Sequence, residues 1–299
     1  VASRPQPRDD CWEIGSITKV FTGMLLADMS LRGDVHLDDP VGVHLPNDVR
    51  ERLPPLDRQP TLEDLATHHA GLPSVPFSWL IRSRGPNPYA KLTEAMVFDA
   101  LGPRTRRPER AKFKYSNLGM GLLGHILERV AGQPYDPLVR DRVLDPLGLD
   151  GIGVGTCGSR SQLLHGFRKG KSTPPWTFGA LAACGAMRST PSDLVSFARS
   201  VLEPPTGRVG DAMRLAMEAR RNGPASDMRI GLGWMIRSGP TGDVVWHNGG
   251  TYGASSFFAA DRRRSMAVIA LGNVGPRLVP RLDGSCWALL DGLGDGSGD

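Results

Sequence analysis

A serine and a lysine stand one helical turn apart in the segment Gly15-Ser16-Ile17-Thr18-Lys19. At this spacing the Lys19 ammonium can reach the Ser16 hydroxyl on the same face of a helix. A serine hydroxyl is a weak nucleophile at neutral pH and needs an adjacent base to become reactive. The pair therefore predicts a serine nucleophile with a lysine base, although a helix-capping serine followed by an exposed lysine would look the same.

The second motif is Tyr115-Ser116-Asn117, which precedes a predicted helix. Tyr115 can move a proton to and from Ser16, and the Asn117 amide can bind a substrate carbonyl. A turn that ends in a helix cap is the simpler alternative for this motif.

The third motif is His247-Asn248-Gly249-Gly250, at the end of a predicted strand. Paired glycines let a backbone approach closely, so the N–H groups of Gly250 and Ser16 can form an oxyanion hole. We expect His247 to take part in catalysis and Asn248 and Gly249 to contact the substrate. The alternative is a plain hairpin turn, since Asn-Gly is a strong turn signal.

In this order, the three motifs resemble those of the class C β-lactamase-like serine acyl-transfer superfamily. That superfamily includes penicillin-binding proteins, D-aminopeptidases, family VIII carboxylesterases and natural-product acyltransferases. The resemblance runs from about residue 12 to residue 273. Further stretches that carry it are Leu37-Asp-Asp-Pro40, Thr61-Leu-Glu-Asp64, His68-His-Ala-Gly-Leu-Pro73, Asp145-Pro-Leu-Gly148, Ser189-Thr-Pro-Ser-Asp193 and Gly231-Leu-Gly-Trp234.

The resemblance implies an α+β fold, with an antiparallel sheet flanked by helices. We expect a single catalytic domain over residues 1–299, with a helical subdomain at roughly residues 60–185. The resemblance also implies an acyl-enzyme mechanism in which Ser16 attacks, Lys19 and Tyr115 transfer protons, and Gly250 helps to hold the oxyanion. We expect no metal and no other cofactor.

Two features depart from the family pattern. His247 stands where β-lactamases of this class carry Lys-Thr-Gly, so a β-lactam carboxylate would lose its usual cation and we expect weak β-lactam hydrolysis at most. Only 15 residues precede Ser16, fewer than in relatives. We therefore expect a shortened N-terminal edge of the sheet, whose unpaired backbone a partner subunit of a homo-oligomer could cover.

The helices that must position these motifs are visible as local patterns. Apolar residues recur at helical spacing over residues 17–31, and Gly33 supplies a stop. A capping-box pattern at residues 61–64 opens a short helix. An amphipathic helix is predicted over residues 118–131, and another over residues 189–202 with a proline in its first turn.

The pattern changes to short apolar runs in the last third of the chain. These runs, separated by turn residues, cover residues 230–237, 243–247, 253–260 and 265–272. They predict an antiparallel meander, against which the first helix would pack. A final helix is expected over residues 287–293.

Composition favours a globular enzyme. Hydrophobic residues make up 40% of the 299 residues, and no apolar run is long enough to cross a membrane. The net charge is +5, and residues 104–114 contain six basic residues against one acid. A solvated loop is the simplest interpretation of this cluster, and the alternative is that Arg106 and Arg107 bind an anionic substrate group. No motif supports a nucleic-acid partner.

Four cysteines are too few and too scattered for a disulfide scaffold, so we predict free thiols at Cys11, Cys157, Cys184 and Cys286. The first ten residues contain no apolar segment of a secretory signal, which favours a cytoplasmic location.

These observations predict a serine acyl-transfer enzyme that forms an acyl-Ser16 intermediate from a small ester or amide. Water as acceptor would make it an esterase or amidase, and an amine or alcohol acceptor would make it a transacylase. D-aminopeptidase or weak β-lactamase activity is an alternative, as is a silent binding protein on the same scaffold, although such relatives usually lose the serine, lysine or tyrosine. A metal hydrolase has less support, because His68-His69 has no further ligand at metal-binding spacing.

Overall fold

The computed structural model describes residues 10–76, 79, 85–107, 112–158, 161–239, 242–275 and 278–292. The strands are β1 (Trp12–Glu13), β2 (Ile152–Val154), β3 (Gly166–Arg168), β4 (Lys171–Thr173), β5 (Met187–Ser189), β6 (Arg221–Asn222), β7 (Met228–Ile230), β8 (Met235–Gly239), β9 (Gly242–Gly250), β10 (Ser255–Asp261) and β11 (Met266–Gly272). The α-helices are α1 (Thr18–Arg32), α2 (Asn47–Arg50), α3 (Leu62–Ala66), α5 (Glu94–Asp99), α6 (Asn117–Ala131), α7 (Tyr135–Val139), α8 (Ala182–Gly185), α9 (Pro191–Leu202), α10 (Arg208–Met217) and α11 (Val279–Gly292). Short 3₁₀ or π turns are η1 (Gly15–Ile17), η2 (Val41–His44), η3 (Leu56–Arg58), η4 (Arg140–Leu144), η5 (Asp145–Leu147) and η6 (Gly179–Leu181).

The central element is a six-stranded antiparallel sheet in the order β11-β10-β9-β8-β7-β6, drawn entirely from the last third of the chain as the sequence predicts. The predicted strand over residues 230–237 is wrong in one respect, because it is divided into β7 and β8 by a turn at residues 231–234. Gly233 makes this turn possible. Its φ is +71°, and a Cβ there would lie 2.1 Å from the Lys19 carbonyl oxygen.

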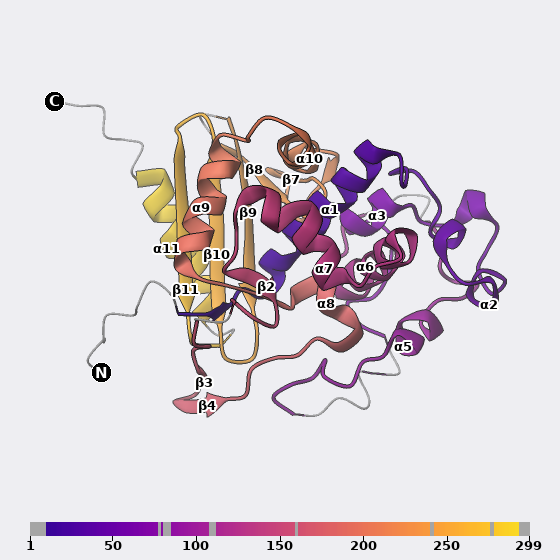
Figure 1. The fold of residues 1–299 in the computed structure, drawn as a ribbon, viewed down its shortest axis with the longest axis horizontal. Helices are drawn as coiled ribbons and strands as arrows, with labels where there is room; N and C mark the ends of the chain where they lie inside the picture. The colour runs from indigo at the N-terminus through magenta and orange to yellow at the C-terminus, as the bar shows by residue number, and fades with distance from the viewer. Residues whose placement is uncertain are drawn as a thin grey trace.

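Helices cover both faces of the sheet (Figure 1). Neighbouring residues of a strand point to opposite faces, and β10 shows this directly. The Phe258 ring packs on Phe197 of α9 at 5.3 Å, whereas the Phe257 ring packs on Trp287 of α11 at 5.3 Å. The sheet is therefore enclosed between α9 and α11, and most of the other helices lie to the right of the sheet in Figure 1.

The predicted helices are confirmed, with ends set by local signals. Helix α1 ends at Gly33, whose φ is +79°, and α6 ends at Gly132, whose φ is +64°. Thr61 and Asp64 form the predicted capping box of α3. Helix α1 packs closely on the turn between β7 and β8, since a Cβ on Gly23 would lie 1.9 Å from the Leu232 carbonyl oxygen.

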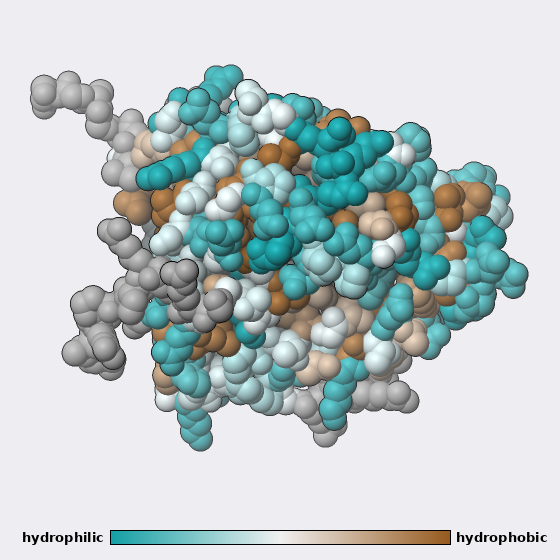
Figure 2. All heavy atoms as spheres, in the orientation of Figure 1, coloured by the Kyte–Doolittle hydropathy of each residue, from teal (hydrophilic) through white to brown (hydrophobic). Residues whose placement is uncertain are grey.

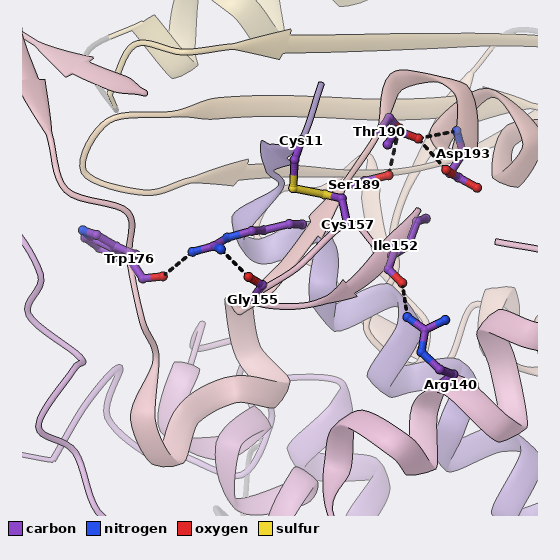
Figure 3. Close-up of a disulfide and its surroundings, with 10 residues drawn as sticks. Cys11, Arg140, Ile152, Gly155, Cys157, Trp176, Ser189, Thr190 and Asp193 are labelled. Carbon is purple, nitrogen blue, oxygen red and sulfur yellow. Dashed lines mark hydrogen bonds between the residues drawn. A yellow bond between two sulfur atoms is a disulfide. The ribbon is translucent and has the colours of Figure 1, made fainter. Parts of the chain in front are cut away.

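A second, three-stranded sheet has the order β1-β5-β2, and its strand β1 directly precedes the turn that contains Ser16. It brings Cys11 and Cys157 together, and they form a disulfide with a Cα–Cα distance of 5.6 Å (Figure 3). The prediction of free thiols is therefore wrong for this pair, which lies 146 residues apart in the chain. It agrees with the structure for Cys184 and Cys286, which are free and buried.

Three further elements differ from the sequence prediction. Helix α10 and the hairpin of β3 and β4 were not expected, and α11 begins at Val279 rather than at Trp287. Leu293, the expected end of that last helix, lies outside the described residues. Among the described helices, none combines the length and apolar character that crossing a bilayer requires. The proposed helical subdomain stays a prediction.

Candidate active site

Ser16 lies in η1, which runs directly into α1, so Lys19 falls in the first turn of that helix. The Lys19 side chain is fully buried, and its ammonium donates hydrogen bonds to Ser16 Oγ at 3.1 Å, Asn117 Oδ1 at 2.8 Å and the Cys184 carbonyl oxygen at 2.7 Å. These three acceptors match the three donors of an ammonium. Ser16 itself is half-buried, so solvent and substrate can reach the hydroxyl.

In the Tyr-Ser-Asn motif, the serine caps a helix and the tyrosine and asparagine lie beside Lys19. Ser116 is the N-cap of α6, because its hydroxyl accepts a hydrogen bond from Gly119 N at 2.8 Å. Tyr115, one residue before the cap, places its ring centroid 4.8 Å from Lys19 Nζ. Asn117, one residue after it, binds that same ammonium and donates to Tyr89 Oη at 3.1 Å. The structure therefore brings together Ser16, Lys19, Tyr115 and Asn117, as expected.

The end of β9 lies against the segment that carries the nucleophile. A Cβ on Gly15 would lie 2.7 Å from Gly250 N, and Gly15 itself has a φ of +49°. A Cβ on Gly249 would lie 2.0 Å from the Ile14 carbonyl oxygen. Only glycine permits this approach, which sets the backbone of Gly250 next to that of Ser16, where a two-donor oxyanion hole is expected. Gly249 thus acts by allowing the contact rather than by binding a substrate with a side chain.

His247 and Asn248 point to opposite faces of β9. His247 is buried on the Lys19 side, where its ring lies 6.4 Å from that of Tyr115, centroid to centroid. Asn248 donates instead to Asp283 of α11 at 2.6 Å. The expectation that Asn248 contacts substrate therefore needs correction, because strand alternation turns it away from Ser16.

Burial, followed by the positive charge of Lys19, lowers the pKa of His247 to about 3. The imidazole is therefore neutral at physiological pH. Its Nδ1 hydrogen-bonds the Asn248 carbonyl oxygen at 2.6 Å, so Nδ1 carries the proton. Its Nε2 is left as an acceptor, and this buried atom has no hydrogen-bond partner among the described residues.

His68 is a site residue that sequence reasoning missed. Its ring is fully buried, and the centroid lies 4.5 Å from that of Tyr115. Burial and then the charge of Lys19 hold the pKa of His68 well below its ordinary value. Ser116 N donates to His68 Nδ1 at 3.3 Å, which leaves the proton on Nε2. This buried donor has no acceptor in the part of the chain that the structure describes. His68 has a φ of +61°, which is uncommon for a residue with a side chain. No sequence pattern indicated this backbone conformation.

The predicted anion-binding arginines do not lie at this site. Arg107 forms an ion pair with the buried Asp64 at 2.8 Å and borders a separate cavity of about 520 Å³ together with Arg220 and Arg221. Arg106 is exposed and donates to the Pro103 carbonyl oxygen at 3.3 Å. Residues 108–111 of the basic cluster lie outside the described residues.

The arrangement can perform acyl transfer. Ser16 Oγ is reachable, a fixed cation holds it in place, and a phenol stands beside that cation. All three donors of Lys19 are engaged, so we assign the proton transfer to the hydroxyl of the neighbouring Tyr115. Two neutral imidazoles border the phenol, so the site carries one cation and no competing positive charge from histidine.

Comparisons with known proteins agree with this geometry. The profile of a family described as Beta-lactamase matches residues 2–285. The chain superimposes on a class C beta lactamase from Rhodobacter sphaeroides with a TM-score of 0.81 at 23% identity, covering 98% of this chain and 89% of the other. A D-stereospecific amidohydrolase from Streptomyces sp. gives a TM-score of 0.73 at 25% identity, covering 92% of this chain and 86% of the other.

The curated relatives are longer than this chain. The D-alanyl-D-alanine-carboxypeptidase/endopeptidase AmpH of Escherichia coli is 26% identical over 299 aligned residues, which is 92% of this chain and 72% of that protein. Protein flp of Staphylococcus aureus is 24% identical over 282 residues, which is 91% of this chain. The chain spans about half the length of Protein flp, at 54%.

Proposed function

Because the chain belongs to the beta-lactamase family, we propose that it is a serine acyl-transfer enzyme in which Ser16 forms an acyl intermediate from a small ester or amide. The observation that carries this proposal is the buried Lys19 ammonium, which ties Ser16 Oγ to Asn117 and lies over the Tyr115 ring. Lysine side chains are almost never fully buried unless they are paired. The complete burial of Lys19 beside the half-buried Ser16 therefore supports a catalytic role for its ammonium.

The reaction follows from the positions of these groups. Ser16 Oγ attacks the carbonyl carbon, and the N–H groups of Ser16 and Gly250 bind the oxyanion. The Tyr115 hydroxyl relays one proton, because its oxygen takes the Ser16 proton as it gives its own proton to the oxygen or nitrogen of the leaving group. The bond to the protonated alcohol or amine then breaks, and acyl-Ser16 remains. Attack by water or by an amine or alcohol then releases the acyl group in the reverse order of steps.

We propose water, an amine or an alcohol as the acceptor of the acyl group. Weak hydrolysis of β-lactams is a less favoured alternative. His247 is neutral, so it supplies no cation for a β-lactam carboxylate. The amidohydrolase among the structural neighbours supports amides as donors beside esters. A homo-oligomer also remains a proposal, and it is motivated by β11, which lies at the edge of the sheet.

The disulfide bears on location. Disulfides persist in oxidising compartments and are rare in the cytoplasm. The Cys11–Cys157 bond therefore supports a site of action outside the reducing cytoplasm, in place of the cytoplasmic location favoured by the sequence.

The test of the function is the intact mass of the protein after exposure to p-nitrophenyl acetate. We expect an acetyl adduct on the wild type and none on Ser16→Ala, with Ser226→Ala, an exposed serine, as the matched control. Tyr115→Phe should slow acylation by roughly 10²-fold or more, the usual effect of removing a positioned proton-transfer group. Lys19→Met should also slow acylation strongly, because it removes the ammonium that holds Ser16 Oγ. An adduct of equal yield on Ser16→Ala would exclude Ser16 as the nucleophile.

A further inference from the structure

The hairpin of β3 and β4 carries three positively charged side chains, those of Arg168, Lys169 and Lys171. Arg168 and Lys171 are direct partners across the two strands, and Lys169 occupies the turn between them. Like charges directly opposite each other destabilise a strand pair. Within the part of the chain that the structure describes, none of the three forms an ion pair with a carboxylate.

These cations border a cavity of about 410 Å³ (pocket volume) that also has hydroxyl groups in its lining. The hydroxyls belong to Ser172, Thr173 and Tyr252. No acidic residue is found among the described residues that line it. Figure 2 shows hydrophilic side chains projecting at the lower left, where Figure 1 places the hairpin.

The cavity is linked to Gly250, and so to the proposed oxyanion hole, by the chain segment that follows β9. Tyr252 comes two residues after Gly250, and two residues span at most about 7 Å. The Arg168 guanidinium lies 4.0 Å from the centroid of the Tyr252 ring. Phe167 N also donates to the Gly253 carbonyl oxygen at 3.1 Å, so the hairpin is bonded to this segment.

The hairpin is held in one geometry. Lys169 and Gly170 have φ values of +52° and +75°, as a two-residue type I′ turn requires. A Cβ on Gly253 would lie 2.0 Å from Thr173 Oγ1, so β4 packs closely on the same segment. The backbone that carries the three cationic side chains therefore keeps a fixed position relative to Gly250.

We propose that this cavity is a subsite for an anionic group, a carboxylate or a phosphate, carried on a short arm by the ester or amide that Ser16 attacks. The proposal rests on the proposed acyl-transfer function and names its substrate class. An anion in the cavity relieves the repulsion between Arg168 and Lys171 and can accept hydrogen bonds from the neighbouring hydroxyls. Anion binding, which the sequence offered as the alternative role of Arg106 and Arg107, is thereby proposed for a different element.

Binding of simple anions tests the subsite without turnover. Isothermal titration calorimetry would measure the Kd of glutarate and of inorganic phosphate for three proteins. They are the wild type, the hairpin variant Lys169→Gln/Lys171→Gln and the control variant Lys91→Gln/Arg262→Gln. The last variant removes the same charge from exposed positions away from the cavity. We expect the hairpin variant to raise Kd about tenfold, as the loss of two partly exposed charge pairs implies, and the control to leave it unchanged. Tighter binding of glutarate than of phosphate would assign a carboxylate, and the reverse order a phosphate. Equal Kd values in all three proteins would overturn the proposal.

Turnover separates failure of the subsite from failure of the function. The p-nitrophenyl monoester of glutaric acid would be compared with neutral p-nitrophenyl valerate. We expect the hairpin variant to raise KM about tenfold for the anionic ester while kcat and the neutral ester stay unchanged, since binding that is equal in ground and transition states affects KM alone. Cleavage of both esters with an unchanged ratio in the hairpin variant would remove the subsite and keep the function. Anion binding at the hairpin without cleavage of either ester would remove the function and keep the subsite.

Discussion

Lys19 and its neighbours show how a single buried charge organises the site at the scale of residues. The ammonium is saturated by Ser16, Asn117 and a backbone carbonyl, so its position is fixed before any substrate arrives. The same charge, added to burial, keeps His68 and His247 neutral. Two complementary orphan atoms result, a donor at His68 Nε2 and an acceptor at His247 Nε2, both beside the Tyr115 ring.

The two buried histidines predict an acid-sensitive fold. In the unfolded chain each titrates near pH 6.5, whereas in the folded state the pKa of His247 is about 3 and that of His68 is also strongly lowered. Below pH 6.5 the unfolded state therefore binds more protons, and stability is lost as pH falls from 6.5 toward the folded pKa. Each histidine contributes a slope of about 1.4 kcal/mol per pH unit in this window.

Urea unfolding at pH 7 and pH 5 measures the effect. For His247→Gln we expect the loss of unfolding free energy between the two pH values to be smaller than in the wild type by about 2 kcal/mol. His36→Gln, at an exposed histidine, should retain the full loss. The assignment of low pKa values would be contradicted if all three proteins lost the same amount.

At the scale of elements, the contact between β9 and the segment before α1 decides whether the site exists. Gly249 meets the Ile14 carbonyl oxygen, whereas the nearest atom to a Cβ on Gly250 is Val279 Cγ2 at 3.5 Å, an ordinary contact. Gly249→Ala should therefore lower the free energy of unfolding by about 1–3 kcal/mol, as overpacking does, and Gly250→Ala by much less. Chemical denaturation of both variants checks the difference, and similar losses would mean that β9 can move away from Ile14 at no cost.

The elements with complete local signals are the ones that the sequence predicts well. Helices α1 and α6 have apolar periodicity and a terminal glycine, and α3 has its capping box. The hairpin of β3 and β4 lacks apolar alternation, because its strands end in charged residues around Lys169 and Gly170. The preceding region is also rich in turn residues, so nothing local separates this hairpin from a loop.

At the scale of the whole molecule, the disulfide predicts a measurable gain in stability. It closes a loop of 146 residues, and loops of this length reduce the entropy of the unfolded chain enough to stabilise a fold by about 2–5 kcal/mol. Cys11→Ser/Cys157→Ser should lose that amount in urea unfolding. A reducing agent should destabilise the wild type equally and leave the double variant unchanged. A wild type insensitive to reductant would show that the bond does not constrain the chain.

Site residues separate into those that motifs can place and those that only the folded chain can place. Motifs can place Ser16, Lys19 and Asn117, because each lies in the first turn of a helix or just before it. Asn248 could not be oriented from the sequence, since a strand position alone does not say which face is buried. The Cys11–Cys157 pairing depends on three strands from distant parts of the chain, and no spacing rule reaches that far.

The order of the site along the chain has a consequence for synthesis. Ser16 and Lys19 are synthesised more than 200 residues before the strand that ends at Gly250. At translation rates of about 5–20 residues per second, the proposed nucleophile waits roughly 10 to 50 seconds for its proposed oxyanion donor. On the proposed mechanism, a growing polypeptide has no competent acylation site until Gly250 has been added, so it cannot consume acyl donors around it before that point.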